Sequence, residues 1–240
     1  MTKKGREFII FPLDVATGKE AMDWVEKLKA HVGMFKVGLE LFVRNGPSIV
    51  EKILSVGGSG VFLDLKFYDI PNTVAGAMAG AAELGVDLVT VHCGENPAML
   101  EAAVAASRGR VRVLGVTVLT SVSGQHLKAA GFTENLWEDP RALVMHRARM
   151  AKDAGCAGIV CSGKEVRWVK ESLGPDFLAV TPGIRPAWDA ENDDQQRITT
   201  PADAVSNGAD YLVIGRPIRN AQNPVAAAQR IAQEIDAALV

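Results

Sequence analysis

Short apolar runs alternate along the chain with longer, alanine-rich segments that have the apolar spacing of helices. Eight runs predict strands, over residues 8–15, 34–41, 61–67, 88–93, 112–120, 158–162, 177–182 and 211–216. Most of these runs carry several apolar residues in succession, which is typical of parallel strands covered on both faces. The segments between them predict helices, over residues 19–31, 47–56, 73–84, 97–107, 140–154, 165–173 and 224–237.

The repeating order of strand and helix predicts an α/β fold and favours a (β/α)₈ barrel. Eight units in 240 residues leave about 30 residues for each unit, as in a compact barrel of this kind. An open, doubly wound sheet is the alternative, but no Gly-x-Gly-x-x-Gly motif follows the first strand, and polar residues end nearly all eight strands. We therefore expect one domain over residues 1–240, folded as a closed TIM barrel.

Two connections are longer than the others. Residues 121–139 follow the fifth strand, and the polar segment 184–199 follows the seventh. Loops of this length in a compact domain often bind or cover a ligand. Because a barrel gathers its ligand at the carboxyl ends of the strands, both connections are candidates for contact with a substrate.

Charged residues lie near the carboxyl ends of the first three strands. Asp14 ends the first strand, Lys36 lies in the second, and the third carries Asp64 and Lys66, with Asp69 shortly after. The two-residue period of a strand places Asp64 and Lys66 on the same face. Alternating opposite charges at such an edge favour the charged form of each partner.

This array predicts chemistry at a carbon that develops negative charge. A protonated Lys66 can stabilise such a carbon by Coulomb attraction and then donate a proton to it. A structural salt-bridge network at the barrel mouth is the alternative interpretation. A Schiff-base lysine is a third, but it needs a desolvated, neutral amine, and the nearby carboxylates favour the ammonium form.

A second set of residues follows the seventh and eighth strands and predicts a phosphate site. The segment Thr181-Pro-Gly-Ile-Arg185 follows strand seven, and Gly215-Arg216 follows strand eight. Loops at these places in barrels commonly hold a phosphate through backbone N–H groups, and an arginine adds a bidentate cation. Gln195, in the polar loop between them, could fold over the anion. The alternative is a tight turn with a surface salt bridge.

Composition narrows the class of protein. The 26 basic and 28 acidic side chains leave a net charge of −2, which argues against a nucleic-acid binder that relies on phosphate contacts. Three cysteines without a repeating spacing predict neither a disulfide framework nor a zinc motif. No run approaches 18 apolar residues, and the apolar run near the start is short and is broken by Pro12. We expect a cytoplasmic protein without a membrane span.

Two motifs resemble those of the orotidine 5′-phosphate decarboxylase family: Asp64-Leu-Lys-Phe-Tyr-Asp-Ile-Pro-Asn-Thr73 and Thr181-Pro-Gly-Ile-Arg-Pro. With shorter supporting pieces the resemblance is collinear over roughly residues 8–236, which is nearly the whole chain. Asp-x-Lys-x-x-Asp alone is shared by a wider group of barrels that includes phosphosugar synthases. The Asp-Ile-Pro-Asn-Thr continuation and the strand-seven motif are far more specific.

The resemblance implies decarboxylation of orotidine 5′-phosphate to uridine 5′-phosphate and CO₂, a step of pyrimidine biosynthesis, with no metal or other cofactor. It implies that Lys66 donates the proton to C6 of the pyrimidine. Lys36, Asp64 and Asp69 complete a catalytic tetrad, with Asp69 reaching in from the second subunit of a homodimer. Thr73, also from the partner, contacts the ribose region.

The resemblance assigns the remaining substrate contacts as well. Asp14 and Lys36 hold ribose hydroxyls, and Thr120 and Ser121 flank the pyrimidine. The residues that grip the 5′-phosphate are Arg185, Gln195, Gly215 and Arg216. The chain departs from the family pattern after strand four, where it runs Val91-His92-Cys93-Gly94. We interpret His92 there as a packed strand-end residue.

Two other functions compete with this prediction. A metal-dependent phosphosugar lyase or synthase from the same barrel group would require a glutamate ligand close after Asp69. Here Ile70-Pro71-Asn72 follows instead. A non-catalytic barrel that binds a phosphorylated ligand would bind nucleotide without turnover, and the intact tetrad disfavours it.

Overall fold

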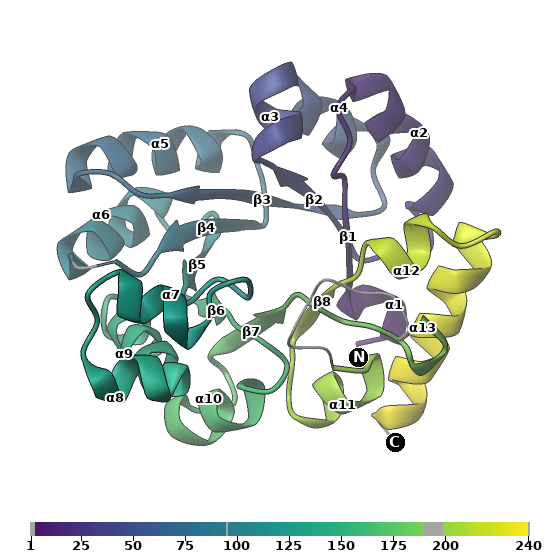
Figure 1. Cartoon of the computed structure of the whole chain (residues 1–240). Coiled ribbons are helices and arrows are strands. Elements are labelled where there is room, and N and C mark those ends of the chain that lie inside the picture. Colours follow the sequence, from purple (N-terminus) through teal and green to yellow (C-terminus); the bar gives the residue numbers. More distant parts are fainter. Residues whose placement is uncertain (1–2, 95, 190–198, 240) are drawn as a thin grey trace.

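The computed structural model describes residues 3–94, 96–189 and 199–239. Eight parallel strands close into one barrel in chain order, and β8 pairs back onto β1 (Figure 1). The strands are β1 (Ile9–Pro12), β2 (Met34–Gly38), β3 (Gly60–Phe67), β4 (Leu88–His92), β5 (Arg112–Val116), β6 (Gly158–Val160), β7 (Leu178–Thr181) and β8 (Tyr211–Val213). The predicted (β/α)₈ barrel is confirmed.

Helices surround the barrel and cover the outer face of the strands (Figure 1). They are α1 (Gly5–Phe8), α2 (Gly18–Leu28), α3 (Leu39–Asn45), α4 (Ser48–Val56), α5 (Pro71–Glu83), α6 (Pro97–Ser107), α7 (Gly124–Ala129), α8 (Glu134–Glu138), α9 (Pro140–Asp153), α10 (Val166–Leu173), α11 (Pro201–Ser206), α12 (Arg216–Arg219) and α13 (Pro224–Ala238), with a 3₁₀ turn at Ala187–Asp189. The seven long helices follow the predicted segments. Proline begins five of the helices, as expected from its preset backbone angle.

Several strands end earlier than the apolar pattern predicts. The predicted strand 34–41 ends at Gly38, which caps α3, and 211–216 ends at Val213, ahead of Gly215, which caps α12. The predicted strand 112–120 ends at Val116. An apolar run continues into a loop or helix that is also buried, so it does not mark where the ladder of hydrogen bonds stops. The predicted strands accordingly include the first residues of α3, 39–41, and the first residue of α12, 216.

The inside of the barrel has an apolar floor. Alternate strand residues point inward and form one buried cluster: Ile10, Met34, Phe62, Leu88, Leu114 and Val180. A larger cluster fills the space between the outer face of the strands and the helices. Two residues beyond the floor, the inward positions of β2, β3 and β4 hold Lys36, Asp64 and Thr90. A polar layer therefore lies directly on the apolar floor, at the carboxyl ends of the strands.

Within the described ranges, no helix is long and apolar enough to cross a membrane.

Candidate active site

A bulge in β3 positions the central charged residues. The pairing of β3 with β4 advances four residues on β3, from 63 to 67, and only two on β4, from 89 to 91. Within this bulge Lys66 has a φ of 51°, a left-handed conformation that costs a non-glycine residue about 1–2 kcal/mol. Asp64 and Lys66 both face the barrel mouth, while Leu65 packs against the outer core. The predicted common face is confirmed, but a bulge and not plain alternation produces it.

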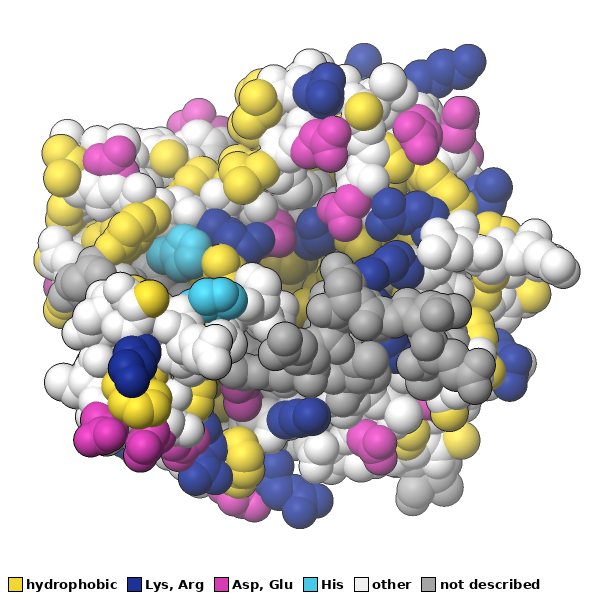
Figure 2. Space-filling view, in the orientation of Figure 1, with side chains coloured by type: hydrophobic (Ala, Val, Ile, Leu, Met, Phe, Trp, Pro, Cys, Tyr) yellow, Lys and Arg dark blue, Asp and Glu magenta, His cyan; other side chains and the backbone are white. Residues whose placement is uncertain are grey.

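Opposite charges alternate across the mouth. The Asp64 carboxylate accepts hydrogen bonds of 2.8 and 2.9 Å from Lys66 Nζ, and its Oδ2 lies 3.7 Å from Lys36 Nζ. Lys36 Nζ also donates to Asp14 Oδ1 at 3.0 Å, and Arg219 Nη2 lies 3.7 Å from Asp14 Oδ2. Basic and acidic side chains accordingly alternate along the hollow at the centre of this face (Figure 2). We call this row, from Lys66 to Arg219, the charge array.

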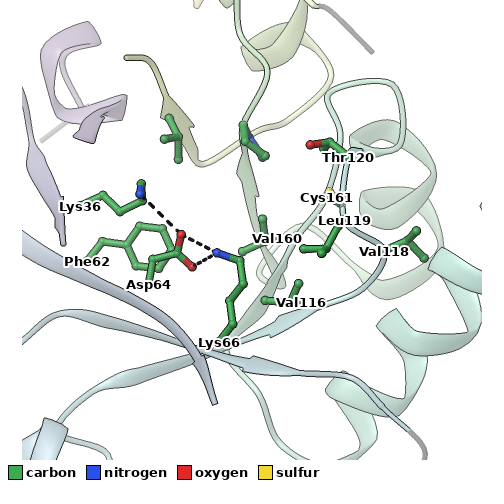
Figure 3. A pocket seen from close by; sticks show the side chains of 12 residues that line it. Lys36, Phe62, Asp64, Lys66, Val116, Val118, Leu119, Thr120, Val160 and Cys161 are labelled. Atoms are coloured by element: carbon green, nitrogen blue, oxygen red, sulfur yellow. Dashed lines mark hydrogen bonds and ion pairs between the residues drawn. The ribbon is translucent and has the colours of Figure 1, made fainter. Parts of the chain in front are cut away.

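The inner end of the charge array borders a cavity of about 170 Å³. Asp64 lies between the two lysines, and apolar side chains line the cavity beyond Lys66 (Figure 3). The lining is completed by Phe62, Val116, Val118, Leu119, Thr120, Val160, Cys161, Pro182 and Val213. Side chains of this kind exclude water and lower the local dielectric, which strengthens the action of a fixed charge on a bound group.

The outer end of the charge array borders a second cavity of about 190 Å³. Its polar lining is Asp14, Lys36, Gly183, Arg185, Gly215, Arg216 and Arg219. Lys36, Pro182 and Val213 line both cavities, so the two adjoin. Arg185 is buried, and its guanidinium donates to the Ile184 carbonyl at 2.8 Å. The arrangement offers an apolar compartment at one end and a cationic compartment at the other.

The structure brings together only part of the predicted site. Asp69 and Thr73 are exposed on the connection after β3 and at the start of α5, outside the described lining of both cavities. Asp69 Oδ1 accepts from the Ile70 N–H at 2.6 Å. Thr120 lines the first cavity, whereas Ser121 is exposed beside it. Gln195 lies outside the described residues.

Two residues of this region were missed by the sequence analysis. Arg219 extends the charge array to a fifth charge, and Thr90 hydrogen-bonds to Asp64. A signal for Thr90 was present, because it is a polar residue at an inward position of the otherwise apolar run 88–91. Arg219 lies three residues after Arg216, almost one helical turn, which gave a weaker signal.

His92 lies at the end of β4, and its ring is 5.7 Å from the ring of Tyr68 in an edge-on arrangement. Burial lowers the pKa of His92 below its ordinary 6.5, and the positive charges of Lys66 and Arg147 lower it further against a smaller opposing effect of Asp64. The environment of His92 therefore favours the neutral imidazole. His92 thus packs at the strand end as predicted, and it also interacts electrostatically with Lys66 of the charge array.

The cysteines lack the properties of nucleophiles. All three cysteines are free and buried. Burial raises the pKa of Cys161, which lines the first cavity, well above its ordinary value, and raises those of Cys93 and Cys156 to about 12. The reactive thiolate is therefore strongly disfavoured at neutral pH. Among the residues with described positions, no group of three or more His, Cys, Asp or Glu side chains could hold a metal ion.

The fold and the site together define a (β/α)₈ barrel protein with two adjoining cavities over a charge array at the carboxyl ends of its strands. A family model described as "Orotidine 5′-phosphate decarboxylase / HUMPS family" matches residues 7–231. The chain belongs to this family.

Individual relatives agree with the family model. The chain is 52% identical to an orotidine 5′-phosphate decarboxylase of Desulfosudis oleivorans over 236 residues, which cover 98% of this chain and 95% of the relative. It is 48% identical to an orotidine 5′-phosphate decarboxylase of Syntrophus aciditrophicus, with 97% and 94% covered. The crystal structure of an orotidine 5′-phosphate decarboxylase from Lactobacillus acidophilus is similar, with a TM-score of 0.82 at 35% identity over 95% of this chain and 98% of that one.

The electrostatic contact of His92 gives a prediction that nuclear magnetic resonance can check. We expect the imidazole of His92 to titrate below pH 6.5, and its pKa to rise in Lys66→Ala because that variant removes a nearby positive charge. Lys19→Ala, on the exposed side of α2, is the control and leaves the pKa of His92 unchanged. A pKa at or above 6.5, or no response to Lys66→Ala, contradicts the environment described here.

Proposed function

We propose that the chain converts orotidine 5′-phosphate to uridine 5′-phosphate and CO₂ without a metal or cofactor. One observation carries the proposal: an ammonium group fixed by Asp64 borders an apolar cavity that adjoins a cationic one. The pyrimidine fits the first compartment and the 5′-phosphate the second. Relatives with this activity in their names support the same assignment.

The bond that breaks in this reaction joins C6 of the pyrimidine to the carboxylate carbon. CO₂ leaves, and the electron pair stays on C6 as a vinyl carbanion that the ring delocalises poorly. An ammonium group fixed beside C6 stabilises this charge without having to reorganise water. Lys66 Nζ then donates a proton to C6, which gives uridine 5′-phosphate, and water restores the proton on Lys66.

Asp64 and Lys36 prepare Lys66 for this step. Asp64 holds the Lys66 amine through both carboxylate oxygens, so the amine keeps one position. Lys36 faces the same carboxylate from the other side and also contacts Asp14. Asp14 and Lys36 belong to the charge array and also line the second cavity, which suits hydrogen bonds to the ribose hydroxyls between base and phosphate.

The ends of the nucleotide are held by the loops after β5, β7 and β8. Thr120 and Ser121 bind the pyrimidine through hydroxyl and backbone hydrogen bonds. Arginine guanidinium groups match phosphate oxygens in bidentate geometry, and the backbone at Gly215 allows close approach. The residues assigned to the phosphate are Arg185, Gln195, Gly215 and Arg216. Binding of the remote phosphate supplies energy that the enzyme uses at C6.

The exposed position of Asp69 supports a homodimer with shared sites. Large apolar side chains lie exposed on the two neighbouring connections after β2 and β3: Leu39, Val43, Tyr68 and Ile70, with Val43 78% and Ile70 66% exposed. Apolar exposure of this kind beside a site is typical of a protein interface. A second copy that covers this surface receives Asp69 and Thr73 into its own site, where Asp69 completes the tetrad.

A metal-dependent phosphosugar lyase or synthase is the weaker alternative. The description of the matching family names HUMPS beside the decarboxylase. The curated relatives compared above, however, carry the decarboxylase name over nearly their whole length. A protein that only binds a ligand does not require an ammonium group fixed beside an apolar cavity, as Lys66 is here.

Replacement of the proton donor tests the proposal. We expect Lys66→Ala to lower kcat for orotidine 5′-phosphate by at least about 10³-fold, because the variant loses both charge stabilisation and the acid. It still binds uridine 5′-phosphate, since the phosphate residues are untouched. Lys164→Ala, an exposed lysine after β6, serves as the matched control and retains wild-type kcat. Near-normal turnover by Lys66→Ala contradicts the assignment.

Mixed dimers test the shared site. Lys66→Ala and Asp69→Ala are each inactive as homodimers, but a heterodimer of the two has one site with both residues intact. Random mixing of the two chains in twofold-symmetric dimers restores about one quarter of wild-type activity. The measurement is turnover after co-expression of the two variants with different affinity tags. Failure to regain activity in isolated heterodimers overturns the exchange of Asp69.

A further inference from the structure

Thr90 is a buried polar residue in the layer that carries the charge array. It lies in the middle of β4, next to the bulge of β3, and its side chain has 0% exposure. The neighbouring positions on β4 are apolar, and the strand on the other side places Leu114 opposite Thr90. A hydroxyl in such a place is costly unless its hydrogen bonds are satisfied.

The Thr90 hydroxyl joins the two catalytic groups of β3. It accepts a hydrogen bond of 2.9 Å from the backbone N–H of Lys66 and donates one of 3.0 Å to Asp64 Oδ1. The same Asp64 oxygen accepts the 2.8 Å hydrogen bond from Lys66 Nζ. The Thr90 hydroxyl, the Asp64 carboxylate and Lys66 therefore form a closed ring of hydrogen bonds, to which Lys66 contributes both its backbone N–H and its ammonium group.

The bulge explains why a hydroxyl is needed at this position. Lys66 has a left-handed backbone, and its N–H is directed to the Thr90 side chain. Of the side chains of this size, only Ser and Thr can accept this hydrogen bond and at the same time donate to a carboxylate. Without the hydroxyl, the Lys66 N–H loses its acceptor and Asp64 loses one of its donors, so the position of each group is less tightly fixed.

We propose that Thr90 is a positioning residue that fixes Asp64 and the strained backbone of Lys66, so that the ammonium group meets C6 in the reactive geometry. The inference rests on the proposed decarboxylation. Thr90 is not among the described residues that line the two cavities. Its loss therefore affects the chemical step and leaves nucleotide binding, which depends on the second cavity, unchanged.

The test compares Thr90→Val with Thr90→Ser. Valine keeps the shape and removes the hydroxyl, and we expect kcat to fall by about 10- to 100-fold because a small displacement of a catalytic group has this effect. The KM for orotidine 5′-phosphate and the Kd for uridine 5′-phosphate stay at their wild-type values. Thr90→Ser retains the hydroxyl and keeps kcat within about threefold of wild type. Thermal denaturation of each variant checks the fold.

Thr117→Val provides the matched control. Thr117 is also a buried threonine. It lies directly after β5, and its hydroxyl donates to the Val160 carbonyl and not to the charge array. This variant loses one buried hydroxyl and keeps its kcat. If Thr90→Val does not fold, Thr90→Cys, with a thiol that is a poor hydrogen-bonding group, carries the same expectation of a lowered kcat.

Each outcome has a clear meaning. Wild-type kcat in Thr90→Val, or equal loss in Thr90→Ser, overturns the role of the hydroxyl. An equal loss in Thr117→Val shows a general effect of core polarity and also overturns it. The wild-type protein is assayed alongside, and if it does not convert orotidine 5′-phosphate at all, the proposed function fails and not this inference alone.

Discussion

The Asp64 carboxylate holds the site together, because two ammonium groups and one hydroxyl meet on it. Lys66 Nζ and the Thr90 hydroxyl are within hydrogen-bond distance of the carboxylate, and Lys36 Nζ lies 3.7 Å from it. Two cations so close together repel each other unless an anion lies between them. The Asp64 side chain is 13% exposed and lies on the apolar floor of the barrel, where an unpaired charge would be costly. Removing Asp64 would therefore leave two partly buried cations and no fixed position for either.

The same array runs from the apolar cavity to the cationic one. Lys36 contacts Asp64 on one side and Asp14 on the other, and Asp14 in turn contacts Arg219 in the cationic cavity. Each member is fixed by neighbours of opposite charge on both sides, apart from the two ends. In the proposed reaction, the phosphate in the second cavity would lie next to charges that are linked through Asp14 and Lys36 to Asp64 and Lys66. Preorganised dipoles and charges of this kind do not have to rearrange as the reaction proceeds, which is the main source of electrostatic catalysis.

The barrel and most of the charge array could be predicted from the sequence, because both follow from periodicity and from the place of charges at strand ends. Lys36 and Asp64 lie where a two-residue period puts them, at inward positions above apolar neighbours, while Lys66 reaches the same face through the bulge in β3. Thr90 could not be assigned a role, since its contacts depend on the register of β4 against a bulge in β3. The bulge itself has no glycine or proline to mark it in the sequence. The proposed role of Asp69 in a second subunit's site came only from the resemblance, because hydrophobic periodicity within one chain carries no information on contacts between chains.

The most direct test of the central claim is the turnover of orotidine 5′-phosphate by the purified wild-type protein in excess EDTA. The charge array alone is proposed to stabilise the C6 carbanion, so chelation should leave the rate unchanged. Loss of the substrate's absorbance and formation of uridine 5′-phosphate in equal amounts is the result this account predicts. A folded, dimeric protein that does not convert the substrate, or that converts it only when a divalent metal is restored, would contradict it.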